Sequence, residues 1–510
     1  MIAGTGGSFA ASDDCNWGGG MGRLSRIGRL PAVMAMAMAL LASPAGLGHG
    51  LAAEWREMAL PKAEATPVAN NPLKGFYTWY GDDIVPGPAA SEHYFRLAWA
   101  DIEPREGEYD FSELERALAK LAPGRRIAFG IMPLNTCCST HHGLDVPADM
   151  PTHLAKSFWI KADPVPGRLG GQTYVPDWND PHYIEQFAKL YAAIGRHFDG
   201  DRRIAWIDVR SYGNWGEGHL GGARGYQSGR IPYDDPSVNI HGATPGTLAT
   251  RLALADAIAK ALPHTRLLAM SDDSEVLVHL LKLPTDIPIG IRRDSWGARQ
   301  FEMGLLPASL SEGDARLVEE RWKTAPFVVE SYGASKVFEA GWKGIVEQIE
   351  SQHVSAIGNG NFNVRRWADL PPGAQAALTR AGVRAGYTYE LTGIRYRLES
   401  EADCTLAVVL SWQNAGIAPP YEAWRTELWL KPVDAGVRPV GPVTVDLPRL
   451  MPVGEAQAKP ACFVLPEAYA GLDMRLWLRV VDATGNRTMQ LPLIDKDALG
   501  DYGLGSLKLQ

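Results

Sequence analysis

The stretch Ile204-Ala-Trp-Ile-Asp-Val-Arg-Ser-Tyr-Gly-Asn-Trp-Gly-Glu-Gly-His219 decides the fold that we expect for this chain. Its first half, 204–209, is short, apolar and rich in β-branched residues, which is typical of a buried strand. The second half is built from Gly, Asn and Trp and presents a single carboxylate, Glu217. A parallel α/β barrel displays catalytic groups in this way, because each buried strand ends in a polar loop at the same rim.

Seven further apolar runs resemble this strand and alternate with helical or loop segments. The predicted strands are 76–79, 94–97, 126–132, 204–209, 266–271, 287–293, 326–333 and 355–358, and the predicted helices are 113–121, 183–198, 248–262, 312–323 and 342–353. Regular alternation implies a parallel sheet, and eight units in this length predict a (β/α)8 TIM-type barrel. A doubly wound open sheet is the alternative, but no Gly-x-Gly-x-x-Gly turn follows the first strand to support it.

The pattern changes after about residue 384. Short strands separated by Pro and Gly turns follow, with no helix of length between them, at 387–392, 405–412, 427–430 and 475–481. This pattern predicts a C-terminal all-β sandwich. The expected organisation is therefore an N-terminal extension and signal peptide at 1–53, a (β/α)8 barrel at 54–384 and a β-sandwich at 385–510.

The N-terminus has the pattern of a targeting segment. Its parts are a basic region at Arg23 to Arg29, an apolar run at 30–47 and a small-residue cleavage motif at 51–53. The apolar run is short for a membrane span, so we expect cleavage, with no stable membrane insertion afterwards. An uncleaved anchor is the alternative. Residues 1–20 do not fit a signal peptide, which makes Met21 a candidate start. The predicted location is periplasmic or extracellular.

Composition limits the partners and cofactors. The net charge is −8 and the chain has no basic run, which argues against nucleic acid as a partner. Sixteen Trp and seventeen Tyr offer flat faces for stacking on sugar rings, although an aromatic core explains them equally well. Export permits disulfides, and Cys404 and Cys462 form a candidate pair. No Cys-x-x-Cys or His-x-x-x-His spacing is present, so we expect neither a metal nor another cofactor.

Two carboxylates are placed for glycoside hydrolysis. Glu217 follows the fourth predicted strand and Glu330 ends the seventh, so a barrel brings both to one rim. A retaining glycosidase holds an acid/base and a nucleophile about 5–5.5 Å apart across the sugar. We predict Glu217 as the acid/base, with a raised pKa, and Glu330 as the nucleophile. The alternatives are a loop carboxylate bonded to backbone amides and a salt bridge at the rim.

Other polar and aromatic residues follow the predicted strands. Arg96 ends the second strand and would keep Glu330 ionised through a hydrogen bond, although an ion pair without catalysis fits equally well. The remaining candidates for substrate binding are Trp79, Asn214, Trp215, His219, Asp294, Trp296, Tyr332 and Asn363. For each of these a purely structural role is the alternative. Asp272, Asp273 or Asp294 is a possible replacement for Glu330, and a wider spacing of the carboxylates would then imply inversion.

The motif Trp99…Glu103-Pro104-x-x-Gly107-x-Tyr109-Asp110-Phe111 resembles the signature of clan A glycoside hydrolases. That resemblance implies a retaining barrel enzyme with its acid/base after strand four and its nucleophile at strand seven. Three further motifs resemble an uncharacterised bacterial family, domain of unknown function 4832: Gly213-x-Trp215-Gly216-Glu217-x-His219, Arg292-Arg293-Asp294-Ser295 and Asn414-x-Gly416-x-Ala418-Pro419. Clan A usually places Asn immediately before the acid/base, whereas this chain has Gly216.

The sequence therefore leaves three hypotheses about function. The leading hypothesis is an exported glycoside hydrolase with a carbohydrate substrate. The second is a glycan-binding or polysaccharide-assembly protein on the same barrel without turnover, which the Gly216 departure favours. A metal-dependent hydrolase using Asp272, Asp273 and histidines is the third, and no ligand spacing in the sequence supports it.

Overall fold

Eight parallel strands close into a barrel in the order β10-β11-β2-β3-β4-β7-β8-β9, which confirms the predicted fold class. The computed structural model describes residues 54–64, 68, 70–79, 85, 91–135, 151, 159–161, 174–219, 245–298, 310–331, 341–360, 362, 366–433 and 438–509. The barrel strands are β2 (Gly75–Trp79), β3 (Glu92–Ala98), β4 (Arg126–Met132), β7 (Ile204–Val209), β8 (Leu267–Met270), β9 (Gly290–Trp296), β10 (Phe327–Ser331) and β11 (Ala356–Gly358). Because all eight are parallel, their carboxyl ends share one rim.

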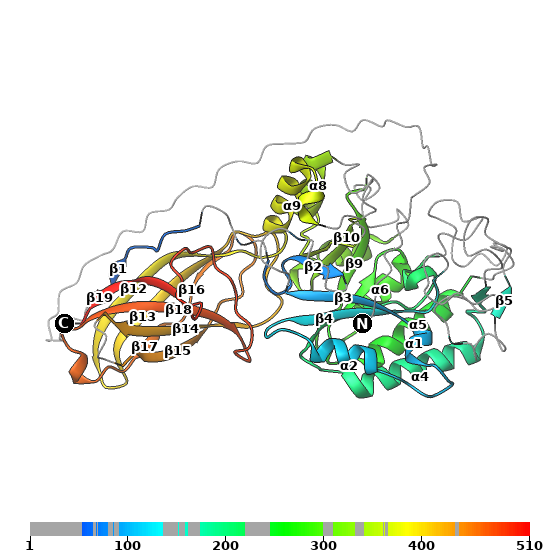
Figure 1. The fold of residues 1–510 in the computed structure, drawn as a ribbon, viewed down its shortest axis with the longest axis horizontal. Helices are drawn as coiled ribbons and strands as arrows, with labels where there is room; N and C mark the ends of the chain where they lie inside the picture. Colours follow the sequence, from blue (N-terminus) through cyan, green and yellow to red (C-terminus); the bar gives the residue numbers. More distant parts are fainter. Residues whose placement is uncertain are drawn as a thin grey trace. The chain divides into compact units, whose positions relative to one another are not determined.

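Helices cover the outside of these strands, as Figure 1 shows for α2 and α4 beside β4. The helices are α1 (Trp99–Ile102), α2 (Ser112–Ala119), α4 (Pro181–Phe198), α5 (Leu248–Ala261), α6 (Ser274–Lys282), α7 (Glu312–Glu319), α8 (Gly341–Ser351) and α9 (Pro372–Arg384), with 3-10 turns η1 (Asn214–Gly216), η3 (Arg321–Lys323), η4 (Trp367–Asp369) and η5 (Glu467–Tyr469). The sequence pattern missed α6 and α9. Helix α6 is only nine residues long and begins at an Asp273 cap, which in the sequence was a spare carboxylate.

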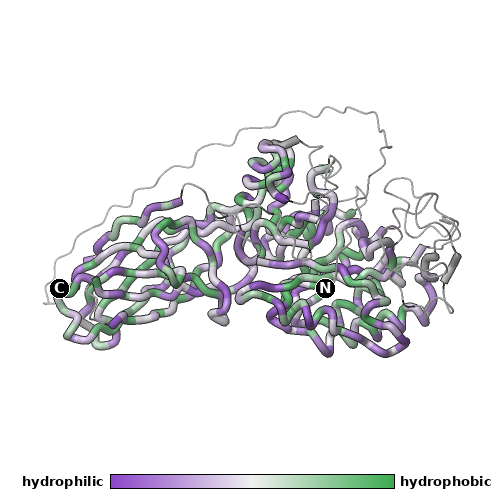
Figure 2. The backbone as a smooth tube through the Cα atoms, viewed as in Figure 1, coloured by the Kyte–Doolittle hydropathy of each residue, from purple (hydrophilic) through white to green (hydrophobic). Residues whose placement is uncertain are grey.

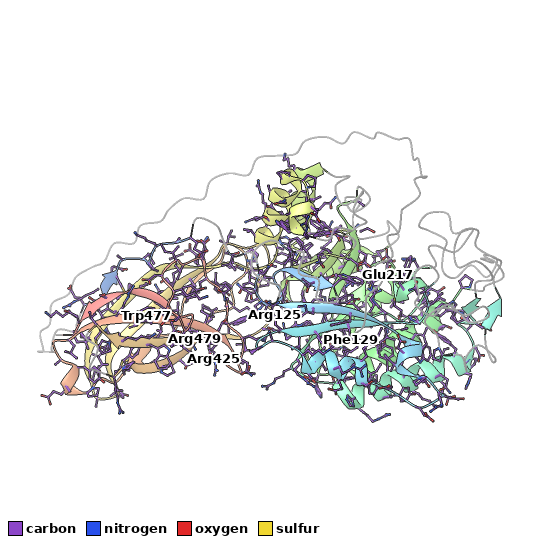
Figure 3. The ribbon with its side chains drawn as sticks, in the orientation of Figure 1. Arg125, Phe129, Glu217, Arg425, Trp477 and Arg479 are labelled. Atoms are coloured by element: carbon purple, nitrogen blue, oxygen red, sulfur yellow. A yellow bond between two sulfur atoms is a disulfide. The ribbon has the colours of Figure 1, made fainter. Side chains whose placement is uncertain are left out.

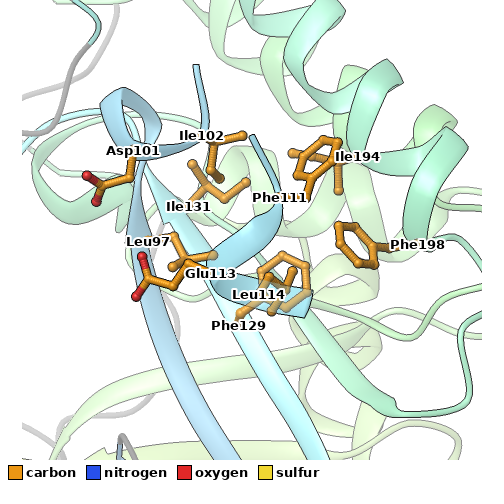
Figure 4. A pocket seen from close by; sticks show the side chains of 10 residues that line it. All are labelled: Leu97, Asp101, Ile102, Phe111, Glu113, Leu114, Phe129, Ile131, Ile194 and Phe198. Atoms are coloured by element: carbon orange, nitrogen blue, oxygen red, sulfur yellow. The ribbon is translucent and has the colours of Figure 1, made fainter. Parts of the chain in front are cut away.

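Most of the barrel core lies between the strands and the helices, and a second, smaller apolar cluster fills the barrel interior. A gap of about 20 Å³ remains in the outer layer, between β3, β4, α2 and α4 (Figure 4). Its walls are mostly apolar and include Leu97, Leu114, Phe129 and Phe198. The gap holds about one water at most, so it is a packing defect and not a ligand site.

Strand β9 extends further than predicted, and it contains a bulge. Two residues, Asp294 and Ser295, stand opposite the single residue Glu330 of β10, because the register shifts between Val329 and Ser331. Ser295 has a positive φ of 69°, an unusual conformation for a residue with a side chain. Bulges of this kind change the direction of side chains, and this one places Asp294 beside Glu330.

The C-terminal part is all-β, as predicted, and consists of two antiparallel sheets that share one hydrophobic core. One sheet has the order β1-β12-β13-β16 with β17 also on β13, and the other has the order β15-β14-β18-β19. The strands are β1 (Arg56–Met58), β12 (Tyr389–Glu401), β13 (Cys404–Asn414), β14 (Trp424–Pro432), β15 (Val440–Asp446), β16 (Glu455–Gln457), β17 (Ala461–Phe463), β18 (Asp473–Asp482) and β19 (Tyr502–Lys508). Hydrophobic and hydrophilic residues alternate along these strands (Figure 2), which suits sheets with one buried face.

Strand β1 departs from the expected domain boundary. We expected residue 54 onward to belong to the barrel, but β1 pairs with β12 in the sandwich, and Met58 is buried in the sandwich core. The short strand adds three residues to a sheet edge. Outside the barrel, β5 (Trp159–Lys161) and β6 (Tyr174–Pro176) form a separate two-stranded sheet.

Cys404 and Cys462 form a disulfide between β13 and β17, with their Cα atoms 5.0 Å apart. This is the pair that the sequence offered. The leader at 1–53, Cys137 and Cys138 lie outside the described residues. Within the described part of the chain, no helix is both long enough and apolar enough to cross a bilayer.

Candidate active site

Glu217 and Glu330 lie on either side of one guanidinium group, that of Arg96 on β3. The Nη1 of Arg96 is 2.9 Å from Glu217 Oε1, and its Nη2 is 2.6 Å from Glu330 Oε2. The three side chains are 11%, 9% and 6% exposed, so these contacts are largely shielded from water. The guanidinium of Arg96 therefore bridges one oxygen of Glu217 and one oxygen of Glu330. The barrel brings together the two carboxylates that the sequence paired.

Two more arginines, Arg210 and Arg292, bind the two glutamates and extend the cluster into the barrel interior. Arg210, which directly follows β7, donates to Glu217 at 3.1 Å, and Arg292 on β9 donates to Glu330. Both arginines also contact Asp208 in the barrel interior, at 3.3 Å and 3.1 Å. All three of these side chains are fully buried. Buried charges persist only when they are paired and hydrogen-bonded, and this network meets that requirement.

Aromatic residues of the barrel interior support the network from below. The hydroxyl of Tyr94 donates to Asp208 at 2.5 Å and accepts from Arg210 Nε at 3.1 Å. The indole of Trp206 donates to the other oxygen of Asp208 at 3.1 Å. These contacts fix the orientation of the arginines, and through them the positions of the two glutamates.

The backbone conformation at Gly216 explains why this position, immediately before Glu217, holds a glycine and not an Asn. Gly216 has a positive φ of 71°, which L side chains rarely adopt. A Cβ at this position would lie 2.5 Å from Cβ of Arg210 and 3.0 Å from its Cα. An Asn before Glu217 would therefore collide with the strand end that carries Arg210. Glycine is therefore a requirement of this loop geometry, which leaves no room for an Asn at this position.

A second glycine makes room for Arg210 itself. A Cβ on Gly130 of β4 would lie 2.5 Å from Cδ of Arg210 and 2.7 Å from its Nε. The arginine side chain thus occupies the space that a side chain on the neighbouring strand would need. Trp206, Asp208 and Arg210 alternate along β7, and the hydrogen bonds above place all three on the inner face.

Asp294 joins the same cluster through the bulge of β9. Its Oδ1 is 3.1 Å from Arg292 Nε, and its Oδ2 is 3.5 Å from Arg96 Nη2, the atom that also binds Glu330. Three carboxylates, of Glu217, Asp294 and Glu330, therefore surround Arg96. The sequence predicted that Asp294 would follow the end of its strand. Asp294 instead lies within β9, because this strand continues to Trp296.

The pKa of Glu217 contradicts the expectation of a raised value. Burial alone would raise this pKa, but Arg96, the hydrogen bond to His219 and Arg210 outweigh burial and hold the pKa well below its usual range. The expectation was wrong because it considered burial and neighbouring carboxylates, but not the contacts of Glu217 with Arg96 and Arg210. Asp294 shows the opposite: burial raises its pKa well above the usual range, and the charges of Glu330 and Glu217 add to the effect against Arg292 and Arg96. The pKa of Asp294 is therefore shifted in the direction opposite to that of Glu217.

His219 and Trp215 flank Glu217 in the same loop. The Nε2 of His219 is 3.4 Å from Glu217 Oε2. Burial would lower the pKa of His219, but the hydrogen bond to Glu217 and its charge raise the pKa above the ordinary value. The indole of Trp215 donates to Asn135 Oδ1 at 3.0 Å, and its ring centre is 5.8 Å from that of His219. Both residues lie where the sequence expected them, beside Glu217.

Trp79, at the end of β2, also belongs to the cluster. The guanidinium carbon of Arg96 lies 4.6 Å from the centre of its indole ring, a cation–π arrangement. The Trp79 ring packs edge-on against Tyr94 with centroids 4.9 Å apart. Arg96 therefore covers one face of the Trp79 ring, and a sugar ring could stack on that face only if Arg96 moved away.

The structure does not bring every candidate to this place. Trp296 is fully buried, and its indole donates to the carbonyl of Ile345 in α8, so its role is packing. Asp273 caps α6 and is paired with Arg251, which leaves it outside the cluster. The backbone of Asn214 begins η1, next to Trp215. Tyr332 and Asn363 lie outside the described residues.

Sequence analysis missed four buried members of the site: Tyr94, Asp208, Arg210 and Arg292. A signal existed for two of them. Asp208 and Arg210 are charged residues two positions apart at the end of an otherwise apolar strand, which places both on one face. A charge on the inner face of a barrel strand is costly and needs a partner nearby.

The remaining described cavities lie away from this cluster. One groove runs between α8 and α9, and another lies at the opposite ends of the barrel strands. Among the described residues, no group of three or more His, Cys, Asp or Glu side chains is arranged to hold a metal ion. The carboxylates around Arg96 are bound by arginines, which leaves them poorly suited as a cation site.

Comparisons with known proteins give distant structural similarities. The chain is similar to endo-glycoceramidase II from Rhodococcus sp., with 12% identity and a TM-score of 0.36 over 79% of this chain and 100% of that one. It is also similar to the catalytic domain of a β-amylase from Paenibacillus polymyxa, with 12% identity and a TM-score of 0.32 over 57% and 90% of the two chains. An exo-β-1,4-mannosidase from Opitutaceae bacterium strain TAV5 shows 14% identity and a TM-score of 0.29 over 57% and 49%.

No family model and no curated protein matches the chain. The resemblance to domain of unknown function 4832 therefore stays a prediction. At TM-scores this low the structural similarities carry no argument for an activity, and the fold stands on the closed barrel itself.

Proposed function

We propose that this chain is a glycoside hydrolase-like protein that takes a glycan at the Arg96 cluster and hydrolyses it with two carboxylates. A single observation carries the proposal: Arg96 holds Glu217 and Glu330, from the ends of the fourth and seventh barrel strands, on one guanidinium. A retaining mechanism needs two carboxyl groups about 5–5.5 Å apart across the sugar. The placement of Glu217 and Glu330 on one guanidinium suits that requirement.

Glu330 is the nucleophile in this proposal. Arg96 and Arg292 both donate to its Oε2, so its negative charge is stabilised. Attack of the carboxylate on the anomeric carbon would break the glycosidic bond, and a proton donor would deliver a proton to the departing oxygen. Water would then cleave the glycosyl–enzyme bond and return the proton to that donor.

Two residues compete for the role of proton donor. Glu217 has the position of the clan A acid/base, but its carboxylate is held ionised by Arg96, Arg210 and His219. Asp294 lies on the other side of Arg96 and retains its proton more readily. A donor must carry a proton near the operating pH, which favours Asp294.

A binding protein without turnover is the second candidate. The observation that favours it is the pairing itself: Glu217 and Glu330 each contact two arginines, so neither carboxylate is idle. A glycan would then be recognised by the polar rim and not cleaved. Turnover measurements separate the two functions directly.

Aryl glycosides with good and poor leaving groups provide the test. Glu330→Gln should abolish turnover of both, because it removes the nucleophile. Loss of the true proton donor should lower turnover of the poor leaving group by about 10²–10⁴-fold and spare the good one, since an activated phenol departs without a proton. Comparing Glu217→Gln with Asp294→Asn identifies the donor.

Glu347→Gln serves as a control, because Glu347 is exposed on α8 and, among the described residues, its ion pair is with the exposed Lys343. It should turn over substrate like the parent protein. If the parent binds glycans but cleaves none of a broad aryl glycoside panel, the hydrolase proposal fails and the binding function replaces it. Full activity in Glu330→Gln would also refute the two-carboxylate mechanism.

A further inference from the structure

A groove of about 700 Å³ lies at the amino-terminal ends of the barrel strands, far along the strands from Glu217. The barrel contributes residues just before β4, β7, β8 and β9, and the sandwich contributes 422–423 and the turn at 482–487. Figure 3 labels Arg125 at this end of β4 and Glu217 near the other rim. The groove is thus separate from the candidate active site.

Positive charge dominates its walls. Six arginines line the groove against three carboxylates, in a chain whose net charge is −8. The arginines are Arg125, Arg126, Arg202, Arg203, Arg266 and Arg487. This local excess runs against the overall charge, so it attracts anions to a place where the rest of the molecule repels them.

The three carboxylates are already engaged. Asp201 pairs with Arg203 at 2.6 Å, and Asp482 pairs with Arg487 at 2.9 Å. Glu422 contacts Arg126 at 2.6 Å and Arg487 at 2.8 Å. Within the described part of the chain, Arg125 and Arg202 make no salt bridge to a carboxylate. The excess charge therefore belongs mainly to these two side chains.

Two guanidinium nitrogens in the groove are buried without a hydrogen-bond partner among the described residues. They are Nη1 of Arg125 and Nε of Arg126. Arg126 is itself only 5% exposed, so its charge is far from bulk water. Buried N–H groups of a native structure almost always have a partner, and an ion or ordered water is the usual one when protein supplies none.

The walls are held in place by structural contacts. Gly124 turns at a positive φ of 78°, and a Cβ there would lie 3.4 Å from the carbonyl oxygen of Asn486. The turn before β4 thus packs closely on the turn after β18. Glu422, between Arg126 and Arg487, joins the same two parts. The turn that carries Arg125 and the side chain of Arg126 are therefore held in place before any ligand arrives.

We propose that this groove is a binding site for an oxyanion, a phosphate, sulfate or carboxylate group, held by Arg125, Arg126 and Arg202. Guanidinium groups match the geometry of these anions with parallel N–H donors, and charge-assisted hydrogen bonds to them are the strong ones. The anion arrives either as a free ion or as a substituent on an acidic glycan.

Titration calorimetry of the full chain tests the proposal with inorganic phosphate, sodium sulfate and polygalacturonate. Arg125→Gln and Arg202→Gln should each weaken binding by about tenfold, the loss of one charge-assisted contact. Arg316→Gln is the matched control, since Arg316 is 76% exposed on α7 and far from the groove in the chain. Circular dichroism checks that each variant is folded, and Arg202, at the groove's edge, provides a second variant if Arg125→Gln unfolds.

The three ligands separate the sources of the anion. Tight binding of phosphate or sulfate alone identifies a free oxyanion, and tight binding of polygalacturonate that is lost in Arg125→Gln identifies an acidic glycan. Either result supports the site. No heat of binding with any of them, or equal affinity in the parent and both groove variants, overturns it. Potassium chloride at matched ionic strength must give no signal, because a general salt effect would also refute a specific site.

Discussion

Arg96 is the residue on which the candidate active site depends. It contacts Glu217, Asp294 and Glu330 and stacks on Trp79, so four rim residues from four strands or loops share one guanidinium. An arginine suits this position because its planar fork donates in several directions at once, whereas a lysine presents a single point charge. The sequence predicted its contact with Glu330 but not its contact with Glu217.

Replacing Arg96 by Gln should destabilise the protein by about 3–5 kcal/mol, because two buried carboxylates lose a partner. The variant should also raise the pKa of Glu217, since the cation named above helps to hold that pKa low. Urea unfolding at pH 7 measures the first effect. Arg105→Gln is the control, because Arg105 is 77% exposed and its pair with Glu108 should contribute nothing measurable. Equal stability of Arg96→Gln and the parent would contradict the buried network.

At the scale of elements, two local features shape the site and neither is regular. The bulge of β9 moves Asp294 beside Glu330, and the glycine turn at Gly216 brings Glu217 back over Arg210. The sequence predicted all eight barrel strands because their apolar runs alternate regularly with helical or loop segments. It did not predict the bulge, since a bulge depends on how two strands pair and not on either strand alone.

Lys74 joins β2 to the end of helix α9. It is buried, and its Nζ donates to the carbonyls of Val383 and Ala385 at 2.9 Å each. Burial, and then the charge of Arg384, lower the pKa of Lys74 to about 7. Folded Lys74 therefore loses its proton near pH 7, whereas Lys74 in the unfolded chain keeps its proton up to the ordinary lysine pKa. Between these two pH values the unfolded chain binds more protons than the folded protein.

The free energy of unfolding should therefore rise with pH in that range. We expect a gain of about 3 kcal/mol from pH 7 to 9.5, because the unfolded chain still holds a proton that folded Lys74 has released. Lys74→Met should remove this slope and be less stable than the parent at pH 9.5, where it lacks both hydrogen bonds. Denaturation at the two pH values measures both effects. A Lys74→Met variant with the slope of the parent would show that Lys74 is not its origin.

At the scale of the whole molecule, barrel and sandwich meet in the ion-pair cluster around Glu422. Its carboxylate contacts Arg126 of β4 and Arg487 of the sandwich. Burial would raise the pKa of Glu422, but Arg126, Arg487 and Arg266 outweigh it and lower the pKa to about 2. Residues 53–510 form one compact unit, and within it the Glu422 cluster connects the barrel to the sandwich.

Glu422→Gln should cost about 3 kcal/mol, at the lower end for breaking a buried pair, because Arg126 and Arg487 each keep one other carboxylate. In the parent, the contribution of Glu422 should be complete above the ordinary glutamate pKa and decrease as pH falls toward 2. Urea unfolding between pH 7 and 3 measures both effects. Glu185→Gln, on the exposed face of α4, should match the parent throughout. A variant as stable as the parent at pH 7 would show that the cluster does not join the two parts.

The sequence by itself determined the architecture: parallel strands follow from apolar runs alternating with helices, and the sandwich follows from short strands without helices. It also placed Glu217 and Glu330 at strand ends, because strand order fixes which residues reach the rim. Only the tertiary structure decided the protonation behaviour of Glu217. A pKa depends on the charges within a few ångströms, and Arg96, which contributes most to lowering that of Glu217, comes from β3, a strand distant in the chain. The positive groove is likewise a product of folding, since its arginines come from four separate places between residues 125 and 487 and contribute no basic run.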